Sequence, residues 1–300
     1  MRLGTRGSAL ALAQAEHVSA LLGGGELVRI TTSGDRGAAE QDKSRWVQEL
    51  EDALKSGEID LAVHSAKDVP GELADGLALL GSPARAAAED VLCGAASLEE
   101  LPPGARVGTS SIRRLAQLRC ARADLEVLAV RGNVDTRLRK LAEGQDGLSA
   151  IVLARAGLQR LGRTAELGAV LDAVRFLPAP GQGALALEGR TQDERTHAAV
   201  AAITDQRALA CLQAERALAH ELSASCHTPL GAHAVPEGGD GIRLRAWVGL
   251  PDGSAWVADE LLGSLAEPGA LGAEVAGRMR AVGAGEMLRR AEEMAGVGGV

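Results

Sequence analysis

Val107-Gly-Thr-Ser-Ser111, followed by Leu115-Ala-Gln117, repeats the pattern of Leu3-Gly-Thr-Arg-Gly-Ser8, followed by Leu12-Ala-Gln14. In both places a short apolar strand ends at Gly-Thr, and a serine then stands where it can cap the next helix. Two similar α/β lobes facing each other would place two such helix starts across one cleft. The alternative is a chance resemblance between two short stretches, and both interpretations remain open at this point.

Short apolar strands alternate with amphipathic helices around these stretches, up to about residue 190. The predicted strands are Leu3-Thr5, Glu26-Thr32, Ile59-His64, Leu77-Leu80, Val107-Thr109, Leu125-Val130 and Ala150-Ala154. The predicted helices are Ala9-Leu22, Trp46-Lys55, Ile112-Arg119 and Val134-Ala142, each with apolar residues at three-to-four spacing. This alternation is typical of α/β domains with parallel or mixed sheets.

The pattern changes from about Asp205. A long predicted helix, Gln206-Leu222, leads into a loop of small residues, two strands (Ile242-Gly249 and Ala255-Leu262) and a closing helix over Ala270-Ala281. Residues 84–88 and 177–183 are interpreted as crossings between two lobes, and Gly181-Gln-Gly183 as a hinge. We therefore expect three domains, comprising residues 1–85 with 182–203, residues 86–181, and residues 204–300.

Positive charge is concentrated in one part of an acidic chain. The formal net charge is -8, yet residues 106–140 carry nine Arg and Lys against three Asp and Glu. Arg113 and Arg114 fall in the first turn of a predicted helix, where a cation opposes the helix dipole. Hydroxyls, free N–H groups and guanidiniums at a helix start form a site for carboxylate or phosphate. A small ligand with several negative groups is therefore expected.

Composition argues against other partners. Aromatic residues are 1% of the chain and the pI is about 5.4, whereas binders of single-stranded nucleic acid use aromatic stacking and a basic surface. No apolar run approaches the ~18 residues of a membrane helix, and no signal or transit segment is recognised. The four cysteines, Cys93, Cys120, Cys211 and Cys226, have no C-x-x-C spacing. A cytoplasmic protein without nucleic-acid or membrane partners is predicted.

Cys226 lies in the small-residue loop that follows the long helix. A buried, inert cysteine is the common fate of this residue type, and a reactive exposed thiol is the alternative that the loop favours. His220, His227 and His233 lie nearby, but their irregular spacing around a single cysteine argues against zinc. No metal site is predicted.

Asp68 follows a predicted strand and precedes Val69-Pro70. A carboxylate at this position in an α/β fold points into the ligand crevice, whereas a turn aspartate paired with Lys67 is the alternative. Arg131 and Arg137 frame another strand-turn-helix segment, which again places cations beside helix-start N–H groups.

Taken in order, these motifs resemble the porphobilinogen deaminase (hydroxymethylbilane synthase) family. The motifs are Gly4-Thr-Arg-Gly-Ser8 with Gln14, Ala62-Val-His-Ser-Ala-Lys-Asp-Val-Pro70, Val107-Gly-Thr-Ser-Ser-Ile-Arg-Arg114, Arg131-Gly-Asn-Val-Asp-Thr-Arg137, Ala156-Gly-Leu-Gln-Arg-Leu-Gly162, Leu177-Pro-Ala-Pro-Gly-Gln-Gly183 and the Cys226 loop. The resemblance implies two lobes like those of type II periplasmic binding proteins and a smaller α+β domain that carries the cysteine. It also implies a transferase that joins four porphobilinogen molecules head to tail, loses ammonia each time and releases hydroxymethylbilane.

The resemblance assigns expected roles to single residues. The cofactor is a dipyrromethane primer held by a thioether to Cys226, and Asp68 is the catalytic carboxylate. The primer is held by Lys67, Asp68, Thr109, Ser111, Arg113 and Arg114. Porphobilinogen and the growing chain are bound by Arg6, Ser8, Gln14, Arg131, Arg137 and Arg160, with Lys43 on a lid over residues 36–45 that is shorter than in the family. A monomer is expected.

The competing hypothesis is a non-catalytic binding protein for small polycarboxylate anions with the same two-lobed fold. Such a protein would need neither Asp68 nor a reactive thiol at Cys226.

Overall fold

The computed structural model describes residues 1–30, 44–225 and 228–298, apart from the side chains of residues 44–46 and 295–298. Two expected site residues, Lys43 and Cys226, lie outside the described residues, as does most of the expected lid. In the part of the chain that is described, no helix is long and apolar enough to cross a membrane.

The first lobe is built on a five-stranded mixed sheet with the order β2-β1-β3-β10-β4. Its strands are β1 (Arg2–Arg6), β2 (Glu26–Ile30), β3 (Leu61–Ser65), β4 (Leu77–Gly81) and β10 (Leu185–Arg190). Strand β1 pairs in parallel with β2 and β3, and β10 runs antiparallel between β3 and β4. The helices are α1 (Ala9–Leu21), α2 (Ser44–Lys55) and α6 (Glu194–Ile203). Apolar residues of α1 and α6 share one core, and those of α2 form another.

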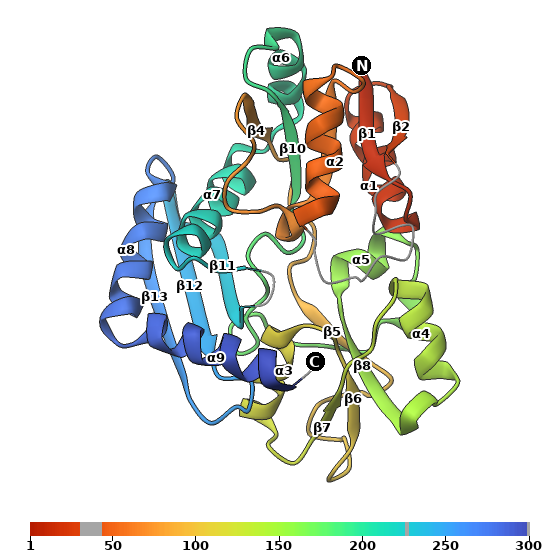
Figure 1. Ribbon diagram of the computed structural model, residues 1–300, viewed down its shortest axis with the longest axis vertical. Coiled ribbons are helices and arrows are strands. Elements are labelled where there is room, and N and C mark those ends of the chain that lie inside the picture. The colour runs from red at the N-terminus through yellow and green to blue at the C-terminus, as the bar shows by residue number, and fades with distance from the viewer. Residues whose placement is uncertain (31–43, 226–227, 299–300) are drawn as a thin grey trace.

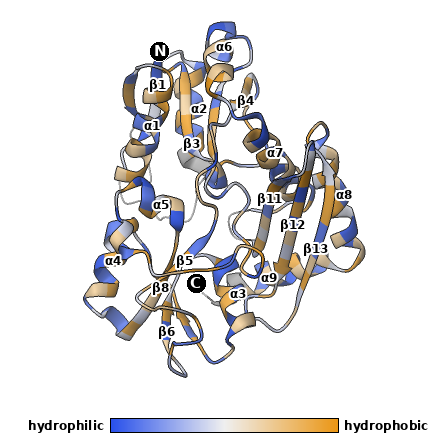
Figure 2. Ribbon diagram, turned by 180° about the vertical axis from the view of Figure 1, so that it is seen from behind, coloured by the Kyte–Doolittle hydropathy of each residue, from blue (hydrophilic) through white to orange (hydrophobic). Residues whose placement is uncertain are grey.

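The second lobe repeats this plan with the order β7-β6-β8-β5-β9. Its strands are β5 (Asp90–Cys93), β6 (Arg106–Gly108), β7 (Glu126–Leu128), β8 (Leu148–Ala154) and β9 (Ala169–Val170). Its helices are α3 (Ile112–Ala121), α4 (Val134–Ala142), α5 (Arg155–Arg160) and the short 3-10 turns η3 (Gln145–Gly147) and η4 (Thr164–Glu166). In Figure 2, hydrophobic residues follow the central strands of both sheets, as in β3 and β8.

The two strand-serine-helix stretches occupy equivalent positions in these sheets. Strand β1 leads into α1 and β6 leads into α3, and each first strand lies between its two parallel neighbours. The Ser8 side chain accepts a hydrogen bond from the Ala11 N–H, and that of Ser111 accepts one from the Arg114 N–H. The repeated motif therefore marks two similar lobes rather than a chance resemblance.

Two crossings connect the lobes and run beside each other. The Ala86 N–H donates to the Gly183 carbonyl at 3.2 Å, and the Ala66 N–H donates to the Ala184 carbonyl at 3.1 Å. Gly181 has a φ of +73°, and a Cβ at this position would lie 3.0 Å from backbone and side-chain atoms of Ala66. The glycine is thus needed both for its conformation and for close contact with the end of β3. In Figure 1, α5 of the second lobe lies next to α1 of the first.

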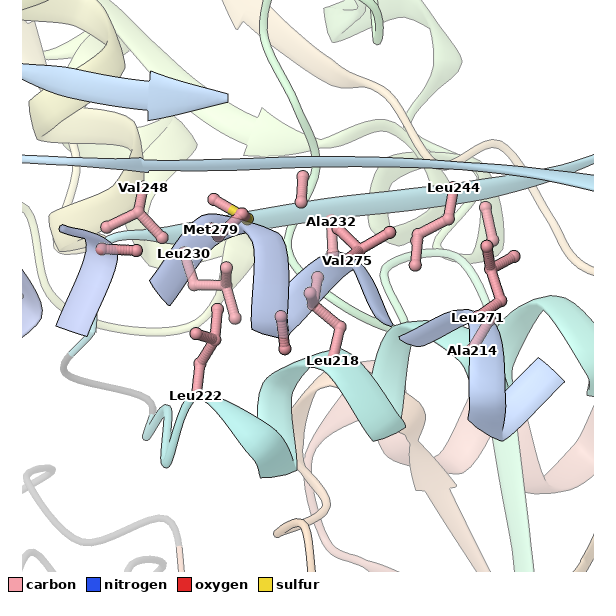
Figure 3. Close-up of a cluster of buried hydrophobic side chains, with 14 of the residues drawn as sticks. Ala214, Leu218, Leu222, Leu230, Ala232, Leu244, Val248, Leu271, Val275 and Met279 are labelled. Carbon is pink, nitrogen blue, oxygen red and sulfur yellow. The ribbon is translucent and has the colours of Figure 1, made fainter. Parts of the chain in front are cut away.

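The remaining elements form a smaller α+β unit. They are α7 (Gln206–Glu221), strands β11 (Leu230–Glu237), β12 (Gly241–Gly249) and β13 (Trp256–Ser264), α8 (Pro268–Ala281) and α9 (Ala284–Gly298). The three strands are antiparallel in chain order, and α7 and α8 pack on one face. Figure 3 shows this core, where Leu218 and Val275 approach Leu230 and Leu244. The predicted fold class of two α/β lobes and an α+β domain is confirmed.

The expectation that the helix over 270–281 closes the chain is wrong, because α9 follows it. Ala284, Leu288 and Ala291 of α9 are buried at helical spacing. Packing of this apolar stripe stabilises a helix whose glycines lower its intrinsic propensity.

Candidate functional site

A pocket opens at the carboxyl ends of β1 and β3, beside the start of α1. Its polar lining comprises Arg6, Ser8, Gln14, His64, Ser65 and Asp68. Parallel strands that end at one edge of a sheet bring their following loops together, which is where α/β folds bind ligands. The structure therefore gathers four predicted site residues, Arg6, Ser8, Gln14 and Asp68, from two separate motifs.

A hydrogen-bonded pair ties α1 to β3 beside the pocket. Gln14 Nε2 donates a hydrogen bond to the Ser65 hydroxyl at 2.7 Å, and the Gln14 side chain is buried. Directly after Ser65 the chain forms the 3-10 turn η2 (Ala66–Asp68), so Lys67 and Asp68 follow the last residue of the strand. Val69-Pro70 then ends the turn, since a residue before proline avoids helical conformation. Asp68 is half-buried at the pocket wall.

Sequence reasoning missed a buried pair between β3 and β10, one member of which, His64, lines the same pocket as Asp68. His64 Nε2 lies 2.8 Å from Glu188 Oε2, and these side chains are 6% and 1% exposed. Glu188 belongs to β10, the strand that returns from the second lobe. A glutamate inside the apolar run Ala184–Gly189 was the available signal, because a carboxylate rarely enters a core without a partner.

Arg113 and Arg114 stand in the first turn of α3, as predicted, but both side chains are buried and contact Asp90. Arg113 Nη2 donates to Asp90 Oδ2 at 2.8 Å. Arg114 donates to Asp90 Oδ1 from Nε at 3.0 Å and from Nη2 at 2.7 Å. Asp90 was not predicted as a site residue. It is fully buried at the start of β5 and supplies the negative charge that the helix-start cations require.

The electrostatics of this cluster favour the ionised carboxylate. Burial by itself would raise the pKa of Asp90, but the charges of Arg113 and Arg114 outweigh it and hold the pKa at about 2. Gln182 of the hinge adds a hydrogen bond to Oδ1 at 2.9 Å. Two guanidiniums share one carboxylate, so the cluster keeps a net positive charge. Among the described residues, Arg113 Nε is buried without a hydrogen-bond partner.

The hydroxyls predicted beside these arginines lie in the loop between β6 and α3. Thr109 is buried, and its Oγ1 accepts a hydrogen bond from the Ser111 N–H at 3.2 Å. Ser111 caps α3. These residues and Lys67 do not contribute to the lining of the pocket at β1 and β3 within the described structure.

The three remaining predicted arginines lie elsewhere in the second lobe. Arg131 is exposed before α4, and Arg137 Nε donates to the Gly132 carbonyl at 2.7 Å. Arg160, at the end of α5, donates from Nη2 to the Gly183 carbonyl at 2.8 Å. Burial lowers the pKa of Arg160, which is the cationic residue of this group that reaches the hinge.

Two family models together match most of the chain. The model described as "Porphobilinogen deaminase, dipyromethane cofactor binding domain" matches residues 1–198. A second, "Porphobilinogen deaminase, C-terminal domain", matches residues 209–281. The chain belongs to the porphobilinogen deaminase family.

Two bacterial relatives of this family align over nearly the full chain. The porphobilinogen deaminase of Xanthomonas oryzae pv. oryzae is 46% identical over 96% of this chain and 98% of the relative. That of Deinococcus radiodurans is 43% identical over 97% of this chain and 98% of the relative. Among solved structures, an ABC transporter from Parabacteroides distasonis is 14% identical, with a TM-score of 0.41 over 74% of this chain and 73% of that one.

Proposed function

We propose that this chain is a hydroxymethylbilane synthase in which Asp68 is the catalytic carboxylate. It joins four porphobilinogen molecules head to tail, with loss of ammonia at each addition, in tetrapyrrole biosynthesis. Membership of the porphobilinogen deaminase family supports the reaction. The observation that carries the assignment of the site is the pocket that gathers Asp68, Arg6 and Ser8 at the ends of β1 and β3.

The polar groups of the two lobes fit the dipyrromethane cofactor of the family. Each pyrrole ring of such a primer carries carboxylates, and the second lobe offers a net positive cluster with an unpartnered buried N–H at Arg113 Nε. Arg114, Lys67, Thr109 and Ser111 complete the proposed primer site. We assign the thioether attachment to Cys226 from the resemblance of its loop. When bound, the dipyrromethane supplies the pyrrole carbon to which the first substrate ring is joined.

Asp68 acts on the substrate rings. Its carboxylate accepts hydrogen bonds from pyrrole N–H groups and stabilises the positive charge that develops when the substrate carbon–nitrogen bond breaks and ammonia leaves. The same group takes part in the proton transfer that accompanies each condensation. Its place in a half-buried pocket strengthens this stabilisation, because nearby water screens it less than at an open surface.

Substrate and growing chain are held by cations from both lobes. Arg6, Ser8 and Gln14 are assigned to the pocket, and Arg131, Arg137 and Arg160 to the facing lobe. Lys43 is assigned to the lid on the family resemblance alone. Bidentate pairing of guanidinium with carboxylate suits the acetate and propionate groups of each ring.

We propose the domain division that the sequence predicts: residues 1–85 with 182–203, residues 86–181, and residues 204–300. Support comes from the membership of β10 in the first sheet and from the separate cores of the lobes and the α+β unit. The monomeric state and the cytoplasmic location stay predictions. A non-catalytic anion-binding protein is not favoured, since relatives named porphobilinogen deaminase match this chain over nearly its full length.

The test of this function is turnover of porphobilinogen by Asp68→Asn. An amide keeps the size but loses the charge, so we expect at least a ~100-fold lower kcat in a protein whose mass still includes the primer. Asp68→Glu should retain more activity than Asn. Asp75→Asn, at an exposed position in the same loop region, is the matched control and should leave kcat unchanged. Near-normal turnover by Asp68→Asn would refute the proposed role.

A further inference from the structure

The loop that follows Asp68 is held by a side chain from the third domain. Arg216, on α7, donates hydrogen bonds from Nη2 to the Pro70 carbonyl at 2.8 Å and to the Gly71 carbonyl at 3.0 Å. A third, from Nη1 to the Val69 carbonyl, measures 3.4 Å. One guanidinium therefore forms hydrogen bonds with three successive carbonyl oxygens, the first of which belongs to the residue after Asp68. A planar fork of donors suits this arrangement, whereas a lysine ammonium would not span it in the same way.

Other contacts show that this loop lies along α7. A Cβ built on Gly71 would lie 3.4 Å from His220 Nδ1, one turn beyond Arg216 on the same helix. The loop itself contains no helix or strand between η2 and β4. Its backbone is therefore shaped by contacts with neighbouring elements, including the hydrogen bonds from Arg216 and the packing of Val69 on the buried cluster that contains Leu212 of α7.

The preceding residue on α7 binds the hinge segment that packs on the same turn. Glu215 is fully buried, and its Oε2 accepts a hydrogen bond from the Gly181 N–H at 2.6 Å. Gly181 packs directly on Ala66 of η2. Two neighbouring residues of α7 thus fix the turn that carries Asp68, one through the hinge and one through the loop that follows.

Arg216 is held in place by its surroundings. It is half-buried, and although burial lowers the pKa of its guanidinium, the charge of nearby Glu188 partly offsets this effect. Glu188 is the partner of buried His64 in β3. The position of the guanidinium is therefore set by its hydrogen bonds to the three carbonyl oxygens of the loop, and the negative charge of Glu188 favours its charged form.

We propose that Arg216 is a positioning residue for the deaminase reaction: it holds the Val69–Gly71 backbone so that the Asp68 carboxylate keeps its place in the pocket. This inference rests on the proposed role of Asp68. A displacement of a catalytic group by about 1 Å can cost on the order of 100-fold in rate. Because Asp68 would serve every condensation, loss of Arg216 should slow all four additions by the same factor.

The experiment compares holoenzymes of Arg216→Met and Arg216→Lys with the wild type, well below their unfolding temperatures. We expect kcat of Arg216→Met to fall at least ~10-fold with KM changed less than ~3-fold, and Arg216→Lys to lie between it and the wild type. Rapid mixing followed by mass spectrometry should show each of the four additions slowed alike. Arg207→Met is the matched control, since Arg207 is exposed on the same helix and its Nη2 donates to the Gly239 carbonyl at 3.2 Å rather than to the loop after Asp68.

The outcomes separate the two claims. The positioning role is wrong if kcat of both Arg216 variants equals that of Arg207→Met. It is also wrong if the additions stall at one chain length only. A raised KM with unchanged kcat would also overturn it, because that result describes a binding residue. Asp68→Asn is measured in parallel. Retained turnover in that variant would instead remove the proposed function on which the inference depends.

Discussion

Arg114 donates two hydrogen bonds to one oxygen of Asp90, and Arg113, the preceding residue of the helix, donates one to the other oxygen. Two cations at the start of α3 are thus stabilised by a carboxylate of the protein itself. The proposed primer site is therefore already assembled around an internal counter-charge. The excess positive charge remains for the carboxylates of the primer.

The first prediction concerns the stability that Asp90 supplies. Asp90→Asn leaves two buried guanidiniums without a formal counter-charge, so the free energy of unfolding at pH 7 should fall by about 3 kcal/mol. Urea denaturation measures this change. Glu126→Gln removes one partner of the exposed pair with Arg106 and should cost less than about 1 kcal/mol. Equal losses of unfolding free energy in the two variants would show that the buried cluster stabilises the protein no more than an exposed ion pair does.

The second prediction is the pH dependence of that contribution. The pKa of Asp90 is about 2 in the folded protein and 3.8 ordinarily, so folding favours the ionised form by about 2 kcal/mol. This stabilisation is fully present above about pH 4 and is lost as the pH falls from there towards 2. The difference in unfolding free energy between wild type and Asp90→Asn should be constant from pH 7 to 5 and shrink below pH 4. A difference that is the same at pH 3 and pH 6 would contradict the assignment.

The third prediction separates primer binding from elongation. Arg114→Gln should yield protein with little covalent primer, since Arg114 belongs to the proposed primer site. Arg6→Gln should carry the primer but accumulate intermediates, because Arg6 lines the pocket for the incoming substrate. Intact mass spectra after limiting porphobilinogen report both states. Arg29→Gln, an exposed arginine at the sheet edge, should match the wild type. Identical, fully primed spectra for the first two variants would refute this division of roles.

The fourth prediction concerns the junction between the third domain and the crossings. Glu215 pairs with Arg85 at 2.6 Å and accepts hydrogen bonds from the N–H groups of Gly181 and Ala234. Glu215→Gln removes the charge and one acceptor, so hydrogen exchange at these two amides should accelerate at least ~10-fold. Exposed Glu237→Gln should leave both rates unchanged. Unchanged protection in Glu215→Gln would mean that other contacts hold the junction.

Much of the fold could be predicted from local patterns. The Gly-Thr motifs with Ser8 and Ser111 predicted two helix starts, and both serines act as caps in the structure. The long helix, predicted over 206–222, was also confirmed as α7, over Gln206–Glu221. These features depend on residues within one or two turns of each other, which is the range over which capping and hydrophobic spacing act.

The parts that were missed depend on contacts between distant residues. Strand β5 is four residues long and completely buried, so it shows no alternation, and it begins with a charged residue. Its pairing with β8 is what brings Asp90 within reach of Arg114. The link from Arg216 to the Val69–Gly71 loop joins residues more than 140 positions apart. No local pattern encodes such a contact, although Glu188, an isolated carboxylate in an apolar run, was a visible signal.

The three described cysteines are poorly suited to covalent attachment of the primer. Burial raises the pKa of Cys93 and of Cys211 to about 11, and the Cys120 thiol donates to the Gly253 carbonyl at 3.5 Å. A thiol with a raised pKa is a poor nucleophile at neutral pH, because the thiolate is the reactive form. Covalent attachment is therefore expected at Cys226 alone.

The most direct test of the central claim, a deaminase that builds its product on a covalent primer, is the intact mass of the purified protein, with peptide mapping of the attachment site. The added mass should equal two pyrrole units, reside on the peptide that contains Cys226 and be absent from an inactive Cys226→Ser variant. An unmodified protein that still forms hydroxymethylbilane, or the same modification on Cys93, Cys120 or Cys211, would contradict the account.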